Sequence, residues 1–201
     1  PFVFYFPETD LGFGLAGIYT FFPGKQKSKN PSLIQVGGAY TLKKQLLLNA
    51  TYNLFLKDNT YELFGEFGYY DYLFPYFGIG NNTKYSDQET YFARFPRIEF
   101  TGLKKISGSN FRVGLTLKYD DYSIYKTDSL GVLETGQPQG FQGSVISKLG
   151  LIGRYDTRDI IYNPTKGSYI TLEASGIHKF LGASARSQKI YLDASTYMRL
   201  S

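Results

Sequence analysis

Apolar residues return at every second position through much of this chain. Leu46 and Leu48, for example, flank Leu47 and precede the polar Asn49 in a segment that continues this alternation. Successive side chains of a β-strand point to opposite faces of a sheet, so the pattern predicts strands with one apolar face and one polar face. The same period recurs in residues 111–120 and 145–156, where the polar positions carry charge. We therefore expect an all-β protein.

Two architectures accommodate a sheet with one apolar face. A soluble sandwich packs that face against a second sheet, whereas a transmembrane barrel turns it to lipid and turns its polar face to the lumen. Composition favours the barrel, because the chain has 19 Tyr and 17 Phe and such barrels carry girdles of aromatic residues. No run approaches the roughly 20 apolar residues that a transmembrane helix requires, so we expect spanning strands of roughly 9–11 residues.

Turn residues divide the chain into about ten expected strands, without a change in composition that would mark a second domain. The expected strands include 11–22, 33–42, 60–70, a short strand at 75–80, and 91–105 with a bulge near Pro96. Short turns are expected at Lys43-Lys44, near Leu73-Phe74, at Gly108 and at 163–167, and longer connections at 24–32, 81–88, 127–143 and 176–188. Outer membrane barrels have short periplasmic turns and long external loops, so we expect each group at one end of the barrel.

Charged residues recur at the positions that share the polar face of these strands. Barrel interiors are polar, so we expect ion pairs that hold the shape of the wall or line a hydrated cavity. The lumen-facing residues predicted by this parity are Glu62, Glu66, Arg97, Glu99, Arg112, Lys118, Lys148, Arg154, Asp156, Arg158 and Asp193.

Signals for an enzyme are poor. His178 is the single histidine and there is no cysteine, so neither a two-histidine nor a thiolate metal site is expected. Neither a nucleophile elbow nor a phosphate-binding loop is present in the sequence. A barrel phospholipase that pairs His178 with Ser175, Ser184 or Ser187 is the weakest alternative. We expect no catalytic activity, cofactor or metal.

The net charge of +5 is small for 201 residues, and the basic residues are scattered, so nucleic acid is not an expected partner. Lys25, Lys27 and Lys29 form the densest basic cluster. We interpret it as a solvated loop, with contact to anionic lipid headgroups as the alternative. No signal peptide opens the sequence, which leads from Pro1 straight into apolar residues, so we expect a mature or excised portion.

One segment, Gly150–Ala174, reads GLIGRYDTRDIIYNPTKGSYITLEA and resembles the signature turn of the BamA/TamA superfamily of outer membrane assembly and secretion factors. The opening around Pro7-Glu8-Thr9 and 11–17 is similar to the first barrel strand of that family, and 76–83 resembles a segment of its members from the Bacteroidetes lineage. The likeness covers almost the whole chain. The residues that match the family turn are Arg158, Asp159, Asn163, Pro164 and Gly167.

This resemblance implies a sixteen-stranded barrel in the outer membrane of a Gram-negative bacterium. Residues 1–201 then correspond to about ten strands of it, without the periplasmic POTRA domains, the final strands or the Arg-Gly-Phe loop of the family. A ten-stranded barrel that closes on itself is the alternative. The implied partners are outer membrane lipids and lipopolysaccharide, client β-barrel proteins, and accessory lipoproteins of a larger outer membrane complex.

The resemblance also implies a lateral gate, in which the first strand pairs weakly with the last and the seam opens to template strands of a client protein. Glycine lowers the cost of local opening, although strand glycines also relieve crowding at a barrel bend. Two other functions stay open: a passive or substrate-specific pore, and an accessory barrel whose gate no longer opens. The gate strand corresponds to Gly12, Phe13, Gly14, Leu15, Ala16 and Gly17.

Overall fold

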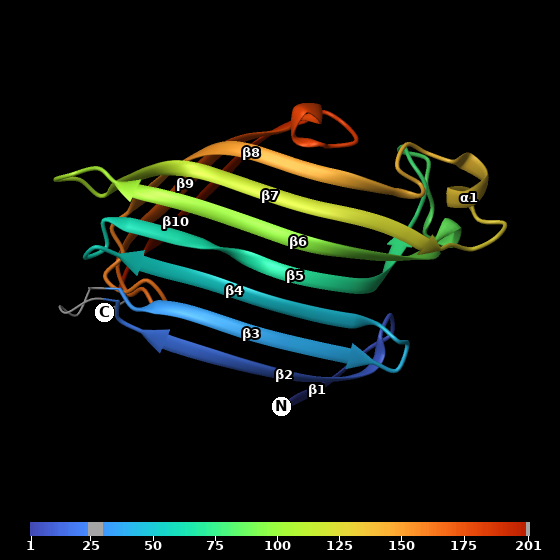
Figure 1. Cartoon of the computed structure of the whole chain (residues 1–201), viewed down its shortest axis with the longest axis horizontal. Coiled ribbons are helices and arrows are strands. Elements are labelled where there is room, and N and C mark those ends of the chain that lie inside the picture. The colour runs from blue at the N-terminus through green and yellow to red at the C-terminus, as the bar shows by residue number, and fades with distance from the viewer. Residues whose placement is uncertain (24–29, 200–201) are drawn as a thin grey trace.

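The fold is one antiparallel sheet in which every strand pairs with the next strand in the sequence (Figure 1). The computed structural model describes residues 1–23 and 30–199, so the cluster of Lys25, Lys27 and Lys29 lies outside the described residues. The ten strands are β1 (Phe2–Phe6), β2 (Asp10–Phe21), β3 (Ser32–Thr41), β4 (Leu46–Leu56), β5 (Tyr61–Tyr76), β6 (Glu89–Lys105), β7 (Phe111–Lys126), β8 (Gly143–Asp156), β9 (Gly167–Ile177) and β10 (Ser187–Tyr197).

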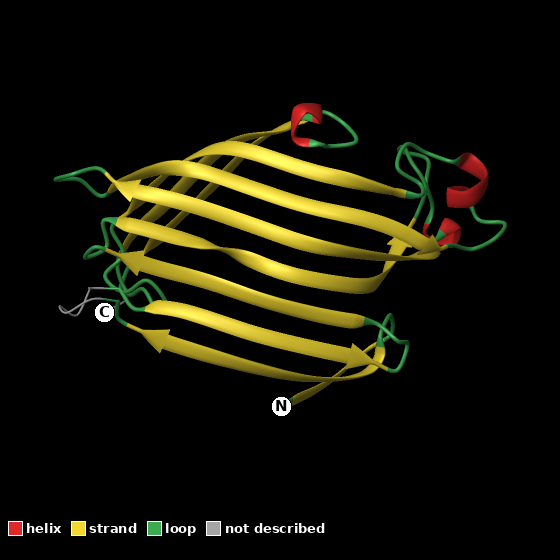
Figure 2. Cartoon of the chain, viewed as in Figure 1, coloured by secondary structure: helices red, strands yellow, loops and turns green. Residues whose placement is uncertain are grey.

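Three short helices lie in the connections between strands: η1 (Tyr85–Asp87), α1 (Val132–Gly136) and η2 (Lys179–Leu181). Figure 2 shows them as small red elements beside the sheet. In the described part of the chain, no helix is both long and apolar enough to span a membrane. The expected all-β fold is therefore confirmed.

The sheet is curved but not closed. In Figure 1 the strands β2 to β7 form the wall toward the viewer, and β9 and β10 pass behind it. Among the described residues β1 pairs only with β2, and β10 pairs only with β9. The two edge strands therefore do not meet, and the alternative of a ten-stranded barrel closed on itself is wrong for this structure.

The expected strand at 75–80 and the turn near Leu73-Phe74 are wrong. β5 continues through both residues to Tyr76, because Leu73 pairs with Phe92 and Phe74 pairs with Tyr91 on β6. The rings of Phe74 and Tyr91 also stack with centroids 5.6 Å apart. The count of ten strands is preserved because the sequence-based prediction missed β1, which pairs along residues 10–14 of β2.

The continuous β5 changes which connections share an end of the sheet. We call one end the helix rim; it holds the connections 7–9, 42–45, 77–88, 127–142 and 178–186, including the three short helices. The other end, the turn rim, holds the β2–β3 connection and the turns 57–60, 106–110 and 157–166. The predicted separation of short turns from long loops is wrong for the first two connections. Lys43-Lys44 lies at the rim of the long loops, and the β2–β3 connection lies at the opposite rim.

The bulge expected near Pro96 occurs instead on β7, opposite the Phe92–Ala93 step of β6. The register between β6 and β7 shifts between Phe92 and Ala93, where β7 has one extra residue. Pro96 itself is paired with Tyr69 of β5. Proline lacks a donor for the ladder but is tolerated where the neighbouring pairing is interrupted.

Candidate functional site

The convex face of the sheet carries a continuous apolar surface that spans nine neighbouring strands. Its side chains are exposed to between 38% (Tyr69) and 80% (Ile190). An apolar surface of this extent marks contact with a membrane or a partner. Members of this surface on β2 to β10 include Phe13, Leu15, Tyr19, Val36, Tyr40, Leu48, Phe67, Tyr69, Ile98, Phe100, Leu115, Leu117, Leu151, Leu172, Ile190 and Leu192.

Polar and charged residues return on this face at both of its ends. At the turn rim Lys104 lies with its Nζ 6.0 Å from the ring centroid of Tyr61. At the helix rim the Arg94 guanidinium lies 5.3 Å from the ring of Tyr125, whose hydroxyl donates a hydrogen bond to Asp71. Tyr61 and Asp71 are ten residues apart on β5, about 33 Å along a strand. If the strands had the tilt of about 40° that outer membrane barrels have, this length would correspond to an apolar band about 25 Å tall.

The concave face brings charges together from strands that are not neighbours. Glu62 on β5 accepts a hydrogen bond of 2.7 Å from Arg154 on β8 and lies 3.7 Å from Arg112 on β7. β6 and β7 separate β5 from β8, so their backbones would be about 14 Å apart in a flat sheet. The contact is possible because the sheet curves toward this face. All three side chains are at most 10% exposed.

A second group of paired charges lies nearer the helix rim. Arg97 binds Asp120 through two hydrogen bonds of 2.9 and 3.0 Å, and Lys118 lies 3.5 Å from the same carboxylate. Glu66 accepts a hydrogen bond from the Tyr70 hydroxyl. Separately, Lys148 and Glu173 form an ion pair of 2.8 Å. The structure thus places the predicted lumen residues on the concave side, most of them already paired.

The family-like turn between β8 and β9 is held by its own side chains. Arg158 donates to Asp156 at 2.7 Å and to the Ile161 carbonyl at 3.2 Å. Asp159 accepts hydrogen bonds from the Thr165 amide at 3.0 Å and from the Thr165 hydroxyl at 2.6 Å. These hydrogen bonds hold the pKa of Asp159 well below its usual range. The first two residues of the matched motif therefore form a structural clamp.

The remaining residues of that motif shape the turn. Gly167 has a φ of 107°, a left-handed conformation that favours glycine, and a Cβ there would overlap the Thr157 carbonyl. Asn163 and Pro164 lie at the tip of the turn. Beside them the Tyr162 hydroxyl donates a hydrogen bond of 3.4 Å to the Pro31 carbonyl, so this turn reaches the β2–β3 connection.

The predicted gate strand, residues 12–17, is part of β2 and is covered along half of its length. Phe4 of β1 pairs with Gly12 and Phe2 pairs with Gly14. A Cβ at either glycine would overlap the phenylalanine ring opposite it, so these glycines make room for β1. Around Gly17, by contrast, nothing lies within 4 Å of a Cβ.

The predicted gate strand is open at the edge of the sheet from Leu15 onward, whereas Phe13 pairs with Val3 of β1. Phe13 and Leu15 point to the convex face and are 49% and 68% exposed, while Ala16 lines a hollow on the concave face together with the β1 rings. From Leu15 to Phe21, β2 has β3 as its sole partner among the described residues. Sequence reasoning missed β1, although its apolar and aromatic residues FVFYF are typical of a strand.

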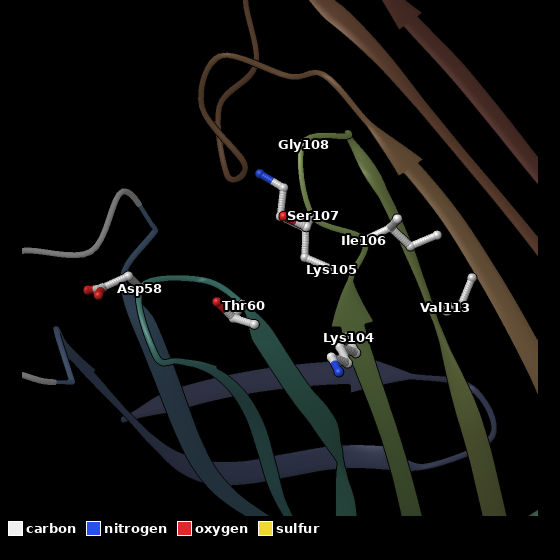
Figure 3. Close-up of a pocket in the computed structure, with 8 residues that line it drawn as sticks. All are labelled: Asp58, Thr60, Lys104, Lys105, Ile106, Ser107, Gly108 and Val113. Carbon is white, nitrogen blue, oxygen red and sulfur yellow. The ribbon is translucent and has the colours of Figure 1, made fainter.

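A hollow of about 640 Å³ opens at the turn rim between two hairpins (Figure 3). Its charged lining residues are Asp58, Lys104 and Lys105, which supply one carboxylate and two ammonium groups. Asp58 is hydrogen-bonded to neither of the two lining hydroxyls, Thr60 and Ser107, in the part of the chain that the structure describes.

Two serines of the phospholipase alternative lie near the histidine, because His178 lines one hollow with Ser187 and another with Ser175. The His178 ring lies over Gly176 and 5.2 Å from the Phe180 ring. Ser184 accepts a hydrogen bond from the Val145 amide, and Ser175 is buried. Within residues 1–23 and 30–199 no serine is hydrogen-bonded to His178, and the same residues hold no group of three or more metal-ligating side chains.

Comparison with known proteins adds no family assignment: no protein-family model matches the sequence, and no curated protein is significantly similar to it.

Proposed function

We propose that this sheet is part of the wall of a transmembrane β-barrel in a bacterial outer membrane. The observation that carries the proposal is the apolar band on the convex face, opposite a concave face of paired charges. Unpaired backbone groups cost several kcal/mol each in hydrocarbon, so the open edges at β1 and β10 imply further strands. A sixteen-stranded barrel supplies them.

We further propose that the barrel is of the BamA/TamA type and assists the insertion or translocation of outer membrane proteins. The clamped turn at Arg158 and Asp159 supports this class through its resemblance to the family turn. The open stretch of β2 from Leu15 to Phe21 supports a role in templating, because an unpaired edge accepts a strand of another chain by β-augmentation. Client strands are then recognised mainly through their backbone.

A passive or substrate-specific pore is the competing function. Selective pores depend on rings of charged side chains that face the permeant. Here Asp120 is bound by Arg97 and Lys118, and Glu62 is bound by Arg112 and Arg154. Charges engaged in such pairs maintain the wall and offer little to a passing ion, which favours the assembly function over a selective pore.

Site-specific crosslinking in cells tests the assembly function. A photoreactive phenylalanine analogue replaces Tyr19 on the open stretch of β2 in the full-length protein. The matched control replaces Phe100 of β6, which is also on the convex face but has paired strands on both sides. We expect adducts with newly made outer membrane β-proteins from position 19 and none from position 100.

Two results contradict the proposed function. If neither position gives an adduct with a β-protein while the barrel is inserted, the templating role is wrong and a pore is favoured. If both positions capture β-proteins equally, contact is not specific to the strand edge.

A further inference from the structure

The helix-rim end of the β9–β10 hairpin carries basic side chains without acidic neighbours in the sequence. His178, Lys179 and Arg186 fall within residues 174–188, which contain no Asp or Glu. Lys179 and Arg186 line one hollow together with Phe180. Among the described residues, neither Lys179 nor Arg186 forms an ion pair, and both are exposed. This is a local excess of positive charge.

Backbone contacts with β8 fix the loop that presents these charges. The Ser184 amide donates to the Val145 carbonyl at 2.9 Å, and the Ser184 hydroxyl accepts from the Val145 amide at 2.9 Å. The His178 amide donates to the Ser147 carbonyl at 3.3 Å. Between these anchors η2 holds Phe180 on the surface with 74% of its area exposed. The backbone that carries Lys179 and Phe180 is therefore held in place before any ligand arrives.

An apolar groove begins below this cluster and runs along the convex face. One hollow of about 520 Å³ connects His178 with Leu149 and Ile190. A second hollow of about 530 Å³ continues it toward Gly153, where a side chain at the glycine would meet nothing within 4 Å. The two hollows share Leu115, Leu151 and Ala174. The groove covers about 13 Å of β8 between Leu149 and Gly153.

We propose that this groove binds an anionic glycerophospholipid. Its headgroup phosphate lies between Lys179 and Arg186, and one acyl chain lies in the groove toward Gly153. Ammonium and guanidinium groups bind phosphate oxygens through charge-assisted hydrogen bonds. Phe180 suits the headgroup level, where aromatic rings are enriched. This inference rests on the proposed function, because it requires the convex face to contact the bilayer.

A phospholipid and a free phosphate ion would use different parts of this site. A free ion uses the basic cluster alone and leaves the groove unfilled. A phospholipid matches the positive cluster with its phosphate and the groove with its chain. A neutral phospholipid can also place its chain in the groove, but the positive charges attract its headgroup less strongly. A preference for anionic over neutral lipid therefore identifies the site.

Fluorescence quenching measures this preference directly, since the chain has no tryptophan. Ile190→Trp adds a reporter in the groove of the full-length protein reconstituted in phosphatidylcholine vesicles, and its quenching is measured against that of the unsubstituted protein. We expect brominated phosphatidylglycerol to quench it at a several-fold lower mole fraction than brominated phosphatidylcholine. Adding Lys179→Ala and Arg186→Ala is expected to abolish this preference, since two surface charges that contribute about fivefold each to anionic-lipid binding account for all of it.

The matched control removes two basic residues at the other rim. Lys57 and Lys104 both lie beside the Tyr61 ring, so Lys57→Ala with Lys104→Ala is expected to leave the preference unchanged. An equal loss of lipid preference in the control overturns the proposed site in favour of a general charge effect.

Equal quenching by the two lipids also overturns the proposed site but leaves the membrane wall in place. If neither lipid quenches the reporter, both the site and the proposed function are wrong. Reversal of the preference by inorganic phosphate overturns the lipid in favour of a free ion.

Discussion

Glu62 is the residue on which two arginines of the concave face converge. Arg154 and Arg112 approach its two carboxylate oxygens, and all three side chains are almost completely buried. A buried cation that loses its partner is strongly unfavourable because neither water nor another charge compensates it. Here one carboxylate contacts two guanidinium groups, so its removal disturbs two buried cations instead of the single cation of an ordinary ion pair.

We expect Glu62→Gln to lower the free energy of unfolding by about 3–5 kcal/mol, the cost of breaking a buried ion pair. Urea unfolding of the full-length protein refolded in lipid vesicles measures this. The control is Glu173→Gln, which removes one 2.8 Å pair with the more exposed Lys148. Its expected cost is smaller than that of Glu62→Gln, because one cation instead of two loses its partner and that cation is less buried. Similar losses for the two variants contradict the importance of the converging arginines.

At this scale the sequence predicts the face of each charge but not its partner. The two-residue period assigns Glu62 and Arg154 to one face, since parity is a property of the strand itself. Their contact depends on the curvature of four strands, which no local pattern specifies. The same limit applies to Gly12 and Gly14, whose role follows from rings on a strand that the sequence-based interpretation did not include.

At the scale of elements, β1 is the strand held by the fewest interactions. It has five residues and a single pairing partner, and its Phe2, Phe4 and Phe6 rings form a ladder with centroids 6.0 and 5.7 Å apart. The rings occupy the space that Gly12 and Gly14 leave free. β1 therefore depends on the absence of side chains from the facing positions of β2.

We expect Gly14→Val to detach β1, because the new side chain overlaps the Phe2 ring and overpacking of this kind costs about 1–3 kcal/mol. Hydrogen exchange of the β1 amides should speed up, while exchange in β3 and β4 stays unchanged. Gly17→Val is the control, since it lies on the same strand in open space. Unchanged exchange in Gly14→Val means that the rings do not anchor β1.

The boundaries of elements were predictable where turn residues interrupt the alternation, and less so elsewhere. Gly108 ends a regular pattern, and a turn is present there. Around Leu73 and Phe74 the sequence is aromatic on both faces, so alternation is absent and the continuation of β5 depends on pairing with β6. The predicted turn near Leu73-Phe74 therefore placed two connections, Lys43-Lys44 and the β2–β3 connection, at the wrong rim.

At the scale of the whole molecule, the apolar band predicts a dependence on depth. Leu115 and Phe111 lie on the same face of β7 and are 51% and 52% exposed. Leu115 is near the middle of the apolar part of that strand, and Phe111 is its first residue. An arginine facing lipid is most costly at the bilayer midplane, whereas near the interface its charge reaches water.

We therefore expect Leu115→Arg to destabilise the protein by about 2–4 kcal/mol and Phe111→Arg by about 0–1 kcal/mol. Equilibrium unfolding in vesicles measures both values. Equal costs for these two equally exposed positions contradict a bilayer on the convex face, and favour a second protein layer that covers both.

The uninterrupted strand order has a consequence for how such a chain is put together. Every strand docks on the one made just before it, and no strand waits for a distant segment. Low contact order reduces the loop-closure entropy that is lost before the strand pairs form and stabilise the sheet. The polypeptide can therefore be added hairpin by hairpin at a single advancing edge, which suits delivery in an extended form from one terminus. Duplication of one hairpin would also enlarge the wall without rearranging any existing pair.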